Sequence, residues 1–81
     1  MRKNQIEIYR TRDLAESAAL IVQQQRLIQV EREGKVCWFI FEDKNKCGEI
    51  SNQFFFGELL VNAKKYHEAT QTLKNRIFNS Q

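Results

Sequence analysis

The stretch Lys35-Val36-Cys37-Trp38-Phe39-Ile40-Phe41-Glu42 contains six consecutive apolar residues, most of them β-branched or aromatic. A short apolar run of this composition, preceded by a turn that contains Gly34, is typical of a β-strand rather than a helix. Side chains alternate along a strand. One face therefore carries Val36, Trp38 and Ile40, and the other carries Cys37, Phe39 and Phe41. Because both faces are apolar, we expect a central strand that is covered on both sides, or covered on one side and adhesive on the other.

Two more strands are predicted on the N-terminal side of this stretch, at residues 5–10 and 26–32. In the first of them, Ile6 and Ile8 fall on one face, and Glu7 and Tyr9 fall on the other. A helix between the two strands is predicted from Leu14 to about Gln25. The spacing of Asp13 and Glu16 at its start is that of a capping box.

The order strand, helix, strand, hairpin indicates how these strands are arranged. Gly34 lets the chain reverse tightly into the central strand. The first two strands then run parallel with a gap between them, and the third fills the gap in the antiparallel sense. The sequence therefore predicts a three-stranded mixed sheet of order 1-3-2.

The C-terminal half is predicted to be mainly helical. Residues 45–56 fit either a strand that contains the three phenylalanines or a short helix that Gly57 ends, and the helix is favoured. Residues 58–61 are expected to be extended. A last helix, from Ala63 to about Phe78, is capped by Asn62 and buries Tyr66, Ala69, Thr70, Leu73 and Ile77. The predicted fold is a single α+β domain over residues 1–81, β-α-β-β-α-α, with its helices packed on the sheet.

Composition argues against several classes of function. The chain has 81 residues and a net charge of +3, and its three glycines are scattered, so a phosphate-binding loop is not expected. Two cysteines and one histidine are too few to complete a zinc site. We therefore expect a non-enzymatic protein without metal, cofactor or small-molecule substrate. The amino terminus shows no signal-peptide pattern, and no apolar run reaches the roughly 20 residues of a membrane span, so a cytoplasmic protein that does not bind membranes is expected.

Three motifs resemble a known group of proteins. They are Thr11-Arg12-Asp13-Leu14, Phe39-Ile40-Phe41-Glu42-Asp43 and a late segment that closes on Leu73-Lys74. A family of short bacterial proteins, a domain of unknown function, is similar over nearly the whole chain. Its members show a Thr-x-Asp-Leu helix start, a Phe-x-Phe strand that ends in acids, and a late helix that closes on Leu-Lys. The resemblance implies a helix at residues 45–56 and brings no catalytic residues.

The first functional hypothesis is that the protein binds another protein. A domain with few helices and many aromatic rings is expected to leave some rings exposed, and exposed apolar patches usually mark partner surfaces. The candidate interface residues are Phe54, Phe55, Phe56 and Phe78. The partner is expected to be a larger complex or a second copy of the chain.

The alternative hypothesis is that the protein is an accessory protein that contacts nucleic acid. Both ends of the chain are basic, and Lys64, His67, Gln71 and Lys74 follow helical spacing. The candidate residues are Arg2, Lys3, Arg10, Arg12, Lys64, His67 and Lys74. A variant of this hypothesis uses Tyr9, Phe39 and Phe41 as stacking rings on an exposed sheet, as in RNA-recognition domains.

Overall fold

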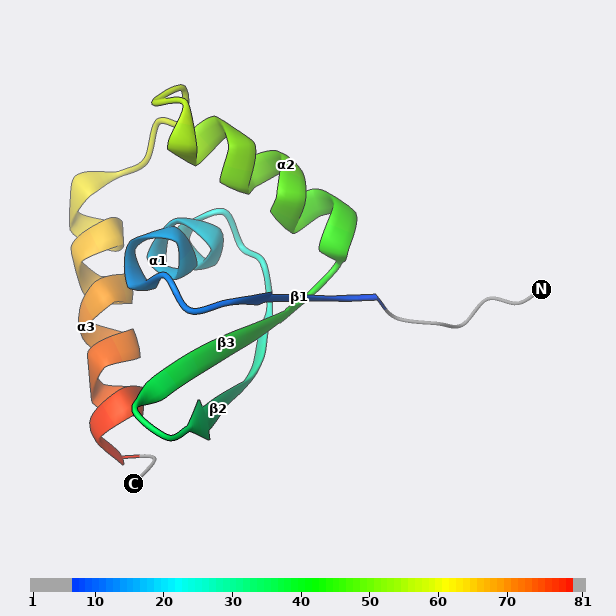
Figure 1. The fold of residues 1–81 in the computed structure, drawn as a ribbon. Coiled ribbons are helices and arrows are strands. Elements are labelled where there is room, and N and C mark those ends of the chain that lie inside the picture. Colours follow the sequence, from blue (N-terminus) through cyan, green and yellow to red (C-terminus); the bar gives the residue numbers. More distant parts are fainter. Residues whose placement is uncertain (1–6, 80–81) are drawn as a thin grey trace.

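The computed structural model describes residues 7–79 as a three-stranded sheet and three helices (Figure 1). In chain order these are β1 (Ile8–Thr11), α1 (Leu14–Val22), β2 (Leu27–Glu33), β3 (Val36–Glu42), α2 (Lys44–Phe55) and α3 (Ala63–Asn79). The predicted α+β class and the element order β-α-β-β-α-α are confirmed. The core is formed by β3 together with one side of each helix.

The sheet has the predicted strand order, β1-β3-β2, but it is antiparallel rather than mixed. The central strand β3 pairs antiparallel with β1 and antiparallel with β2. The two outer strands do run parallel to each other, but β3 separates them. A mixed sheet needs two parallel strands that are hydrogen-bonded directly, and these three strands contain no such pair.

The two faces of β3 have different environments. Phe39 and Phe41 are 1% and 0% exposed and pack in one cluster with residues of all three helices. The other face carries Trp38 and Ile40, which are not part of this cluster, although Ile40 is only 3% exposed. The helices therefore pack on one side of the sheet, and the expectation that the other side binds a partner stays a prediction.

The variant with stacking rings on an exposed sheet is wrong. The rings of Phe39 and Phe41 lie beneath the helices, and the partly buried Tyr9 packs against the same core. Tyr9 pairs with Phe41, and Thr11 pairs with Phe39, so these β1 residues share the core-facing side of the sheet. Ile8, on the opposite side of β1, is 44% exposed.

The first helix begins as expected and ends earlier than expected. Asp13 caps it, since its Oδ1 accepts a hydrogen bond from the backbone N–H of Glu16 at 2.9 Å. The helix stops at Val22 rather than near Gln25. Gln24 adopts a positive φ of 67°, which turns the chain out of the helix and towards β2.

The favoured helix at residues 45–56 is confirmed as α2. Asp43 caps it by accepting from the N–H of Lys46 at 3.1 Å, and Cys47 and Ile50 are buried. Gly57, with a φ of 74°, follows the last turn in the left-handed conformation that glycine adopts at low cost. Gly57 therefore ends α2, as the sequence predicts.

The last helix, α3, also follows its prediction. Asn62 Oδ1 accepts from the N–H of Lys65 at 3.0 Å, and Ala69 and Leu73 are buried while Tyr66, Thr70 and Ile77 are partly buried. Tyr66 Oη donates to the backbone oxygen of Ala15 at 3.1 Å, which fixes α3 against α1. No helix within residues 7–79 combines the length and hydrophobicity that crossing a membrane requires.

Candidate functional site

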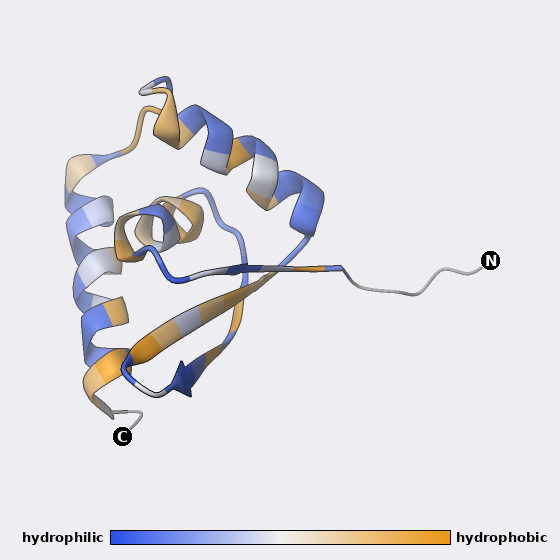
Figure 2. Ribbon diagram, in the orientation of Figure 1, coloured by the Kyte–Doolittle hydropathy of each residue, from blue (hydrophilic) through white to orange (hydrophobic). Residues whose placement is uncertain are grey.

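Three large apolar side chains are exposed where α2 turns into α3. Phe55 is 61% exposed, Phe56 is 78% exposed and Leu60 is 90% exposed. The ring of Phe54 is partly buried and meets the Phe55 ring edge-on, with centroids 5.3 Å apart. We call Phe54, Phe55, Phe56 and Leu60 the aromatic corner. Figure 2 shows the hydrophobic residues at the end of α2 and in the connection that follows it.

Backbone geometry produces this corner. The left-handed Gly57 ends α2 directly after Phe56, so the next residues leave the helix axis. In the connection, Leu59 packs against the core, whereas Leu60 does not. Leu59 therefore contributes to the core, whereas its neighbour Leu60 is left in solvent.

Phe78, the fourth candidate interface residue, lies elsewhere. It is 70% exposed and belongs to the last turn of α3. The aromatic corner precedes the first turn of the same helix, and the two ends of α3 lie far apart (Figure 1). A helix of 17 residues is about 25 Å long. The structure therefore places three of the four candidate phenylalanines together and separates the fourth from them.

The outward side of α3 carries most of its polar residues. A ridge along the middle of this side is formed by Lys64, Glu68, Gln71 and Asn75, which follow the spacing i, i+4, i+7, i+11 and are all exposed. Lys74 and His67 flank this ridge on one side, and Lys65 and Arg76 flank it on the other. We call this set of residues the α3 outer face. None of its four cations makes an ion pair within residues 7–79.

A family model matches residues 7–79, and its description is a domain of unknown function, DUF5659. The chain belongs to the DUF5659 family. The match covers every helix and strand described above, so the fold described here is the fold of a DUF5659 domain. Neither the comparison with curated proteins nor the comparison with solved structures gives a match to this chain.

The basic residues predicted to act together in this DUF5659 protein do not form one surface. Lys64, His67 and Lys74 belong to the α3 outer face, but Arg10 lies on the side of the sheet that faces away from the helices. Arg12 is exposed in the turn between β1 and α1. Arg2 and Lys3 lie outside the described residues. The structure supports a basic surface on α3 alone.

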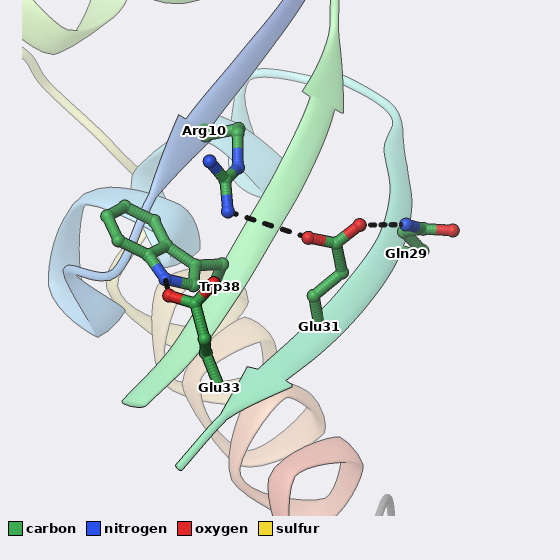
Figure 3. A network of polar contacts seen from close by, with 5 residues as sticks. All are labelled: Arg10, Gln29, Glu31, Glu33 and Trp38. Carbon is green, nitrogen blue, oxygen red and sulfur yellow. Dashed lines mark hydrogen bonds and ion pairs between the residues drawn. The ribbon is translucent and has the colours of Figure 1, made fainter. Parts of the chain in front are cut away.

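Arg10 is engaged with its own sheet (Figure 3). Its guanidinium lies over the Trp38 ring, with Cζ 4.6 Å from the ring centroid, and its Nη2 is 3.5 Å from Glu31 Oε1. Trp38 Nε1 donates to Glu33 at 3.2 Å, and Gln29 donates to Glu31 at 2.6 Å. Charged side chains of both edge strands, Arg10 of β1 and Glu33 of β2, thus cover the Trp38 ring. This arrangement reduces the apolar area that the uncovered side of the sheet presents to solvent.

The sequence reasoning missed a buried carboxylate. Glu16 is 3% exposed, and its two oxygens accept hydrogen bonds from Tyr9 Oη at 2.5 Å and from Thr11 Oγ1 at 2.6 Å. We call these three residues the Glu16 network. Burial, together with the hydrogen bond to Glu16, raises the pKa of Tyr9 above its ordinary value. The capping-box spacing identified Glu16 but assigned it to the helix start, and its role in joining α1 to β1 is visible only once β1 is placed.

The two cysteines are expected to react very differently with thiol reagents. Cys47 is fully buried, and burial, with the negative charges of Asp43 and Glu16, raises its pKa to about 11. Cys37 is partly exposed. At pH 8, an aromatic disulfide reagent should modify Cys37 in the native protein and Cys47 only when the protein is unfolded. Mass spectrometry of the modified peptides, with and without urea, measures this. Equal labelling of both thiols in the native state would contradict it.

The same pKa shift makes stability depend on pH in the alkaline range. The unfolded thiol titrates near 9, and the folded thiol titrates near 11. Cys47 therefore contributes its full stabilisation below pH 9 and loses it as pH rises from 9 to 11, by up to about 2.5 kcal/mol. Urea titrations at pH 8 and pH 10.5 should show this fall, and Cys47→Ala should reduce the difference between them.

Proposed function

We propose that this DUF5659 protein is a non-enzymatic binding module of the bacterial cytoplasm that attaches to a protein partner through the aromatic corner. The observation that supports the proposal is the exposure of Phe55, Phe56 and Leu60, between 61% and 90%, within residues 55–60 at the end of α2 and in the connection to α3. Soluble domains seldom leave several large apolar side chains together in water, and such groups usually mark a contact surface.

The rest of the molecule supports the choice of this surface. Trp38, the largest side chain of the uncovered sheet side, is covered by the guanidinium of Arg10 and hydrogen-bonded to Glu33. Phe56 and Leu60 have no comparable cover, since both are more than three-quarters exposed. Aromatic residues of this kind are the usual energetic centres of protein interfaces.

The first partner to test is a second copy of the chain, because an 81-residue domain gains stability by burying more surface. Light scattering over a range of protein concentrations should give about twice the monomer mass of 9.7 kDa. Phe56→Asp should weaken the dimer by about 30-fold or more, since it places a charge at the contact centre. Raising the salt concentration should have little effect on an apolar contact.

A matched control separates the corner from general effects of the substitution. Phe78→Asp makes the same chemical change at another exposed position, 70% exposed, and should leave the dimer intact. A monomer at all concentrations would exclude the second copy as the partner. Equal weakening by the two variants would show that the corner is not the contact.

The α3 outer face favours a second candidate function, contact with nucleic acid. It presents Lys64, Lys65, Lys74 and Arg76 against the single acid Glu68, and all of them are exposed. Such cations meet phosphates without reading sequence. Retention on immobilised DNA that falls steeply with salt, and that is lost in the double variant Lys64→Glu and Lys74→Glu, would support it. Retention that is unchanged in that variant would exclude α3 as the contact.

A further inference from the structure

We infer that α3 is a reading helix that enters the major groove of double-stranded DNA, an inference that rests on the second function proposed above. The arrangement of the α3 outer face carries it. The amides Gln71 and Asn75 form the C-terminal half of the ridge, after Lys64 and Glu68. Cations lie on both flanks, Lys74 on one and Lys65 and Arg76 on the other.

The amides occupy the side of α3 that faces away from the core. Gln71 and Asn75 each lie two residues from the fully buried Leu73, which places them about 200° around the helix from it. Both side chains are exposed. Gln and Asn are the residues that pair with adenine N6 and N7 in the major groove. The part of α3 that would project furthest into a groove therefore carries side chains that can form hydrogen bonds with base edges.

The cations occupy the positions that would face the groove walls. Lys74 lies about 100° from Leu73 in one direction around the helix, whereas Arg76 and Lys65 lie on the other flank. In a helix that lies within the groove, one flank faces each phosphate backbone. Cations on both flanks complement this pair of negatively charged walls, whereas a single basic stripe would complement only one of them.

The shape and position of α3 are compatible with this occupant. A helix is about 10–12 Å wide with its side chains, and the major groove of B-form DNA is about 12 Å wide. In Figure 1, α3 forms one border of the molecule, and α1 packs against its inner side. Duplex RNA has a deep, narrow major groove that does not admit a helix. The geometry therefore selects duplex DNA over duplex RNA.

One residue of the ridge, Glu68, carries a negative charge that DNA phosphates would repel. Glu68 follows Lys64 by one turn and is exposed. Its carboxylate would be repelled by the DNA backbone unless it accepts a hydrogen bond from a cytosine amino group. Glu68→Gln should therefore strengthen binding to a duplex of arbitrary sequence, which is the opposite of what removing a contact residue would do.

The test measures binding of the whole protein to a fluorescent 20-base-pair DNA duplex, the matching single strand and the matching RNA duplex. If four phosphates are neutralised, affinity for the DNA duplex should fall about 150-fold between 50 and 200 mM salt. In the double variant Lys74→Gln and Arg76→Gln, affinity should fall only about 12-fold over the same range of salt, because two phosphate contacts remain. The RNA duplex should bind at least about tenfold more weakly than the DNA duplex.

A second variant separates groove reading from phosphate contact. Gln71→Ala with Asn75→Ala removes no charge, so its salt dependence should equal that of the unchanged protein. Selection from duplexes with a randomised centre should yield adenine-rich sequences with the unchanged protein and none with this variant. Circular dichroism of each variant checks that the helices are retained, as expected for substitutions at exposed positions.

The outcomes distinguish the two levels of the proposal. Absence of binding to every nucleic acid at 50 mM salt would overturn the second proposed function and the inference with it. Equal binding of single-stranded DNA, duplex RNA and duplex DNA would leave phosphate contact standing and overturn the reading helix. Preference for duplex DNA in the unchanged protein, with sequence enrichment that the Gln71 and Asn75 variant loses, would support the reading helix.

Discussion

Phe41→Ala is expected to lower the free energy of unfolding at 25 °C by about 3–5 kcal/mol. The Phe41 ring is 0% exposed and contacts the core from near the C-terminal end of β3. Removing a buried phenylalanine side chain costs about 3–5 kcal/mol, from lost transfer free energy and from the cavity that remains. A chain of this length has a total stability of roughly 4–12 kcal/mol. Urea titration followed by circular dichroism measures the loss.

The control makes the same substitution outside the core. Phe78 is 70% exposed and lies outside the aromatic corner, so Phe78→Ala should change the free energy of unfolding by no more than about 0.5 kcal/mol. If the two variants were destabilised equally, Phe41 would not be a core residue in solution. That result would contradict the assignment of Phe41 to the side of β3 that faces the helices. The description of the other side of the sheet depends on this assignment.

Local patterns predicted the elements because their causes lie within a few residues of one another. The caps Asp13 and Asn62, the turn at Gly34 and the end of α2 at Gly57 are set by short-range hydrogen bonds and backbone conformation. The strand order also followed from the sequence, because the most apolar strand needs neighbours on both sides. These features do not require knowledge of distant contacts.

The error about the mixed sheet and the early end of α1 have different causes. In the order 1-3-2, β1 and β2 are parallel but never hydrogen-bonded to each other, so every paired neighbour is antiparallel and the sheet is not mixed. The early end of α1 depends on Gln24, a residue type that rarely adopts a positive φ. Nothing in its local pattern distinguishes it from Gln23 and Gln25.

The candidate site was predictable in composition and not in arrangement. The exposed side of α3 and the three consecutive phenylalanines could be read from spacing and from the sequence itself. Whether Phe78 and Arg10 join those groups depends on tertiary structure, because they belong to the far end of α3 and to the opposite side of the sheet. Likewise, the cover that Arg10 and Glu33 provide for Trp38 arises from pairing between strands that are distant in the chain.

Glu16→Ala is the second substitution with a large expected effect. It removes the acceptor of two hydroxyl groups, Tyr9 Oη and Thr11 Oγ1, and leaves a small cavity beside buried residues of α1. An unsatisfied buried polar group costs about 1–3 kcal/mol. Thr11 is buried and Tyr9 is partly exposed, so with the cavity we expect a total loss of about 2–4 kcal/mol. The loss should be read from the urea midpoint at unchanged slope.

Two comparisons show whether the loss comes from the Glu16 network. Glu49→Ala removes an exposed carboxylate from α2 and should cost less than about 0.5 kcal/mol. Tyr9→Phe and Thr11→Val remove one donor each, and a double-mutant cycle of either with Glu16→Ala should give a coupling energy of about 0.5–3 kcal/mol. Additive effects within about 0.3 kcal/mol would mean that Glu16 stabilises the fold by packing alone. Coupling would show that the hydrogen bonds of this one carboxylate join β1 to α1.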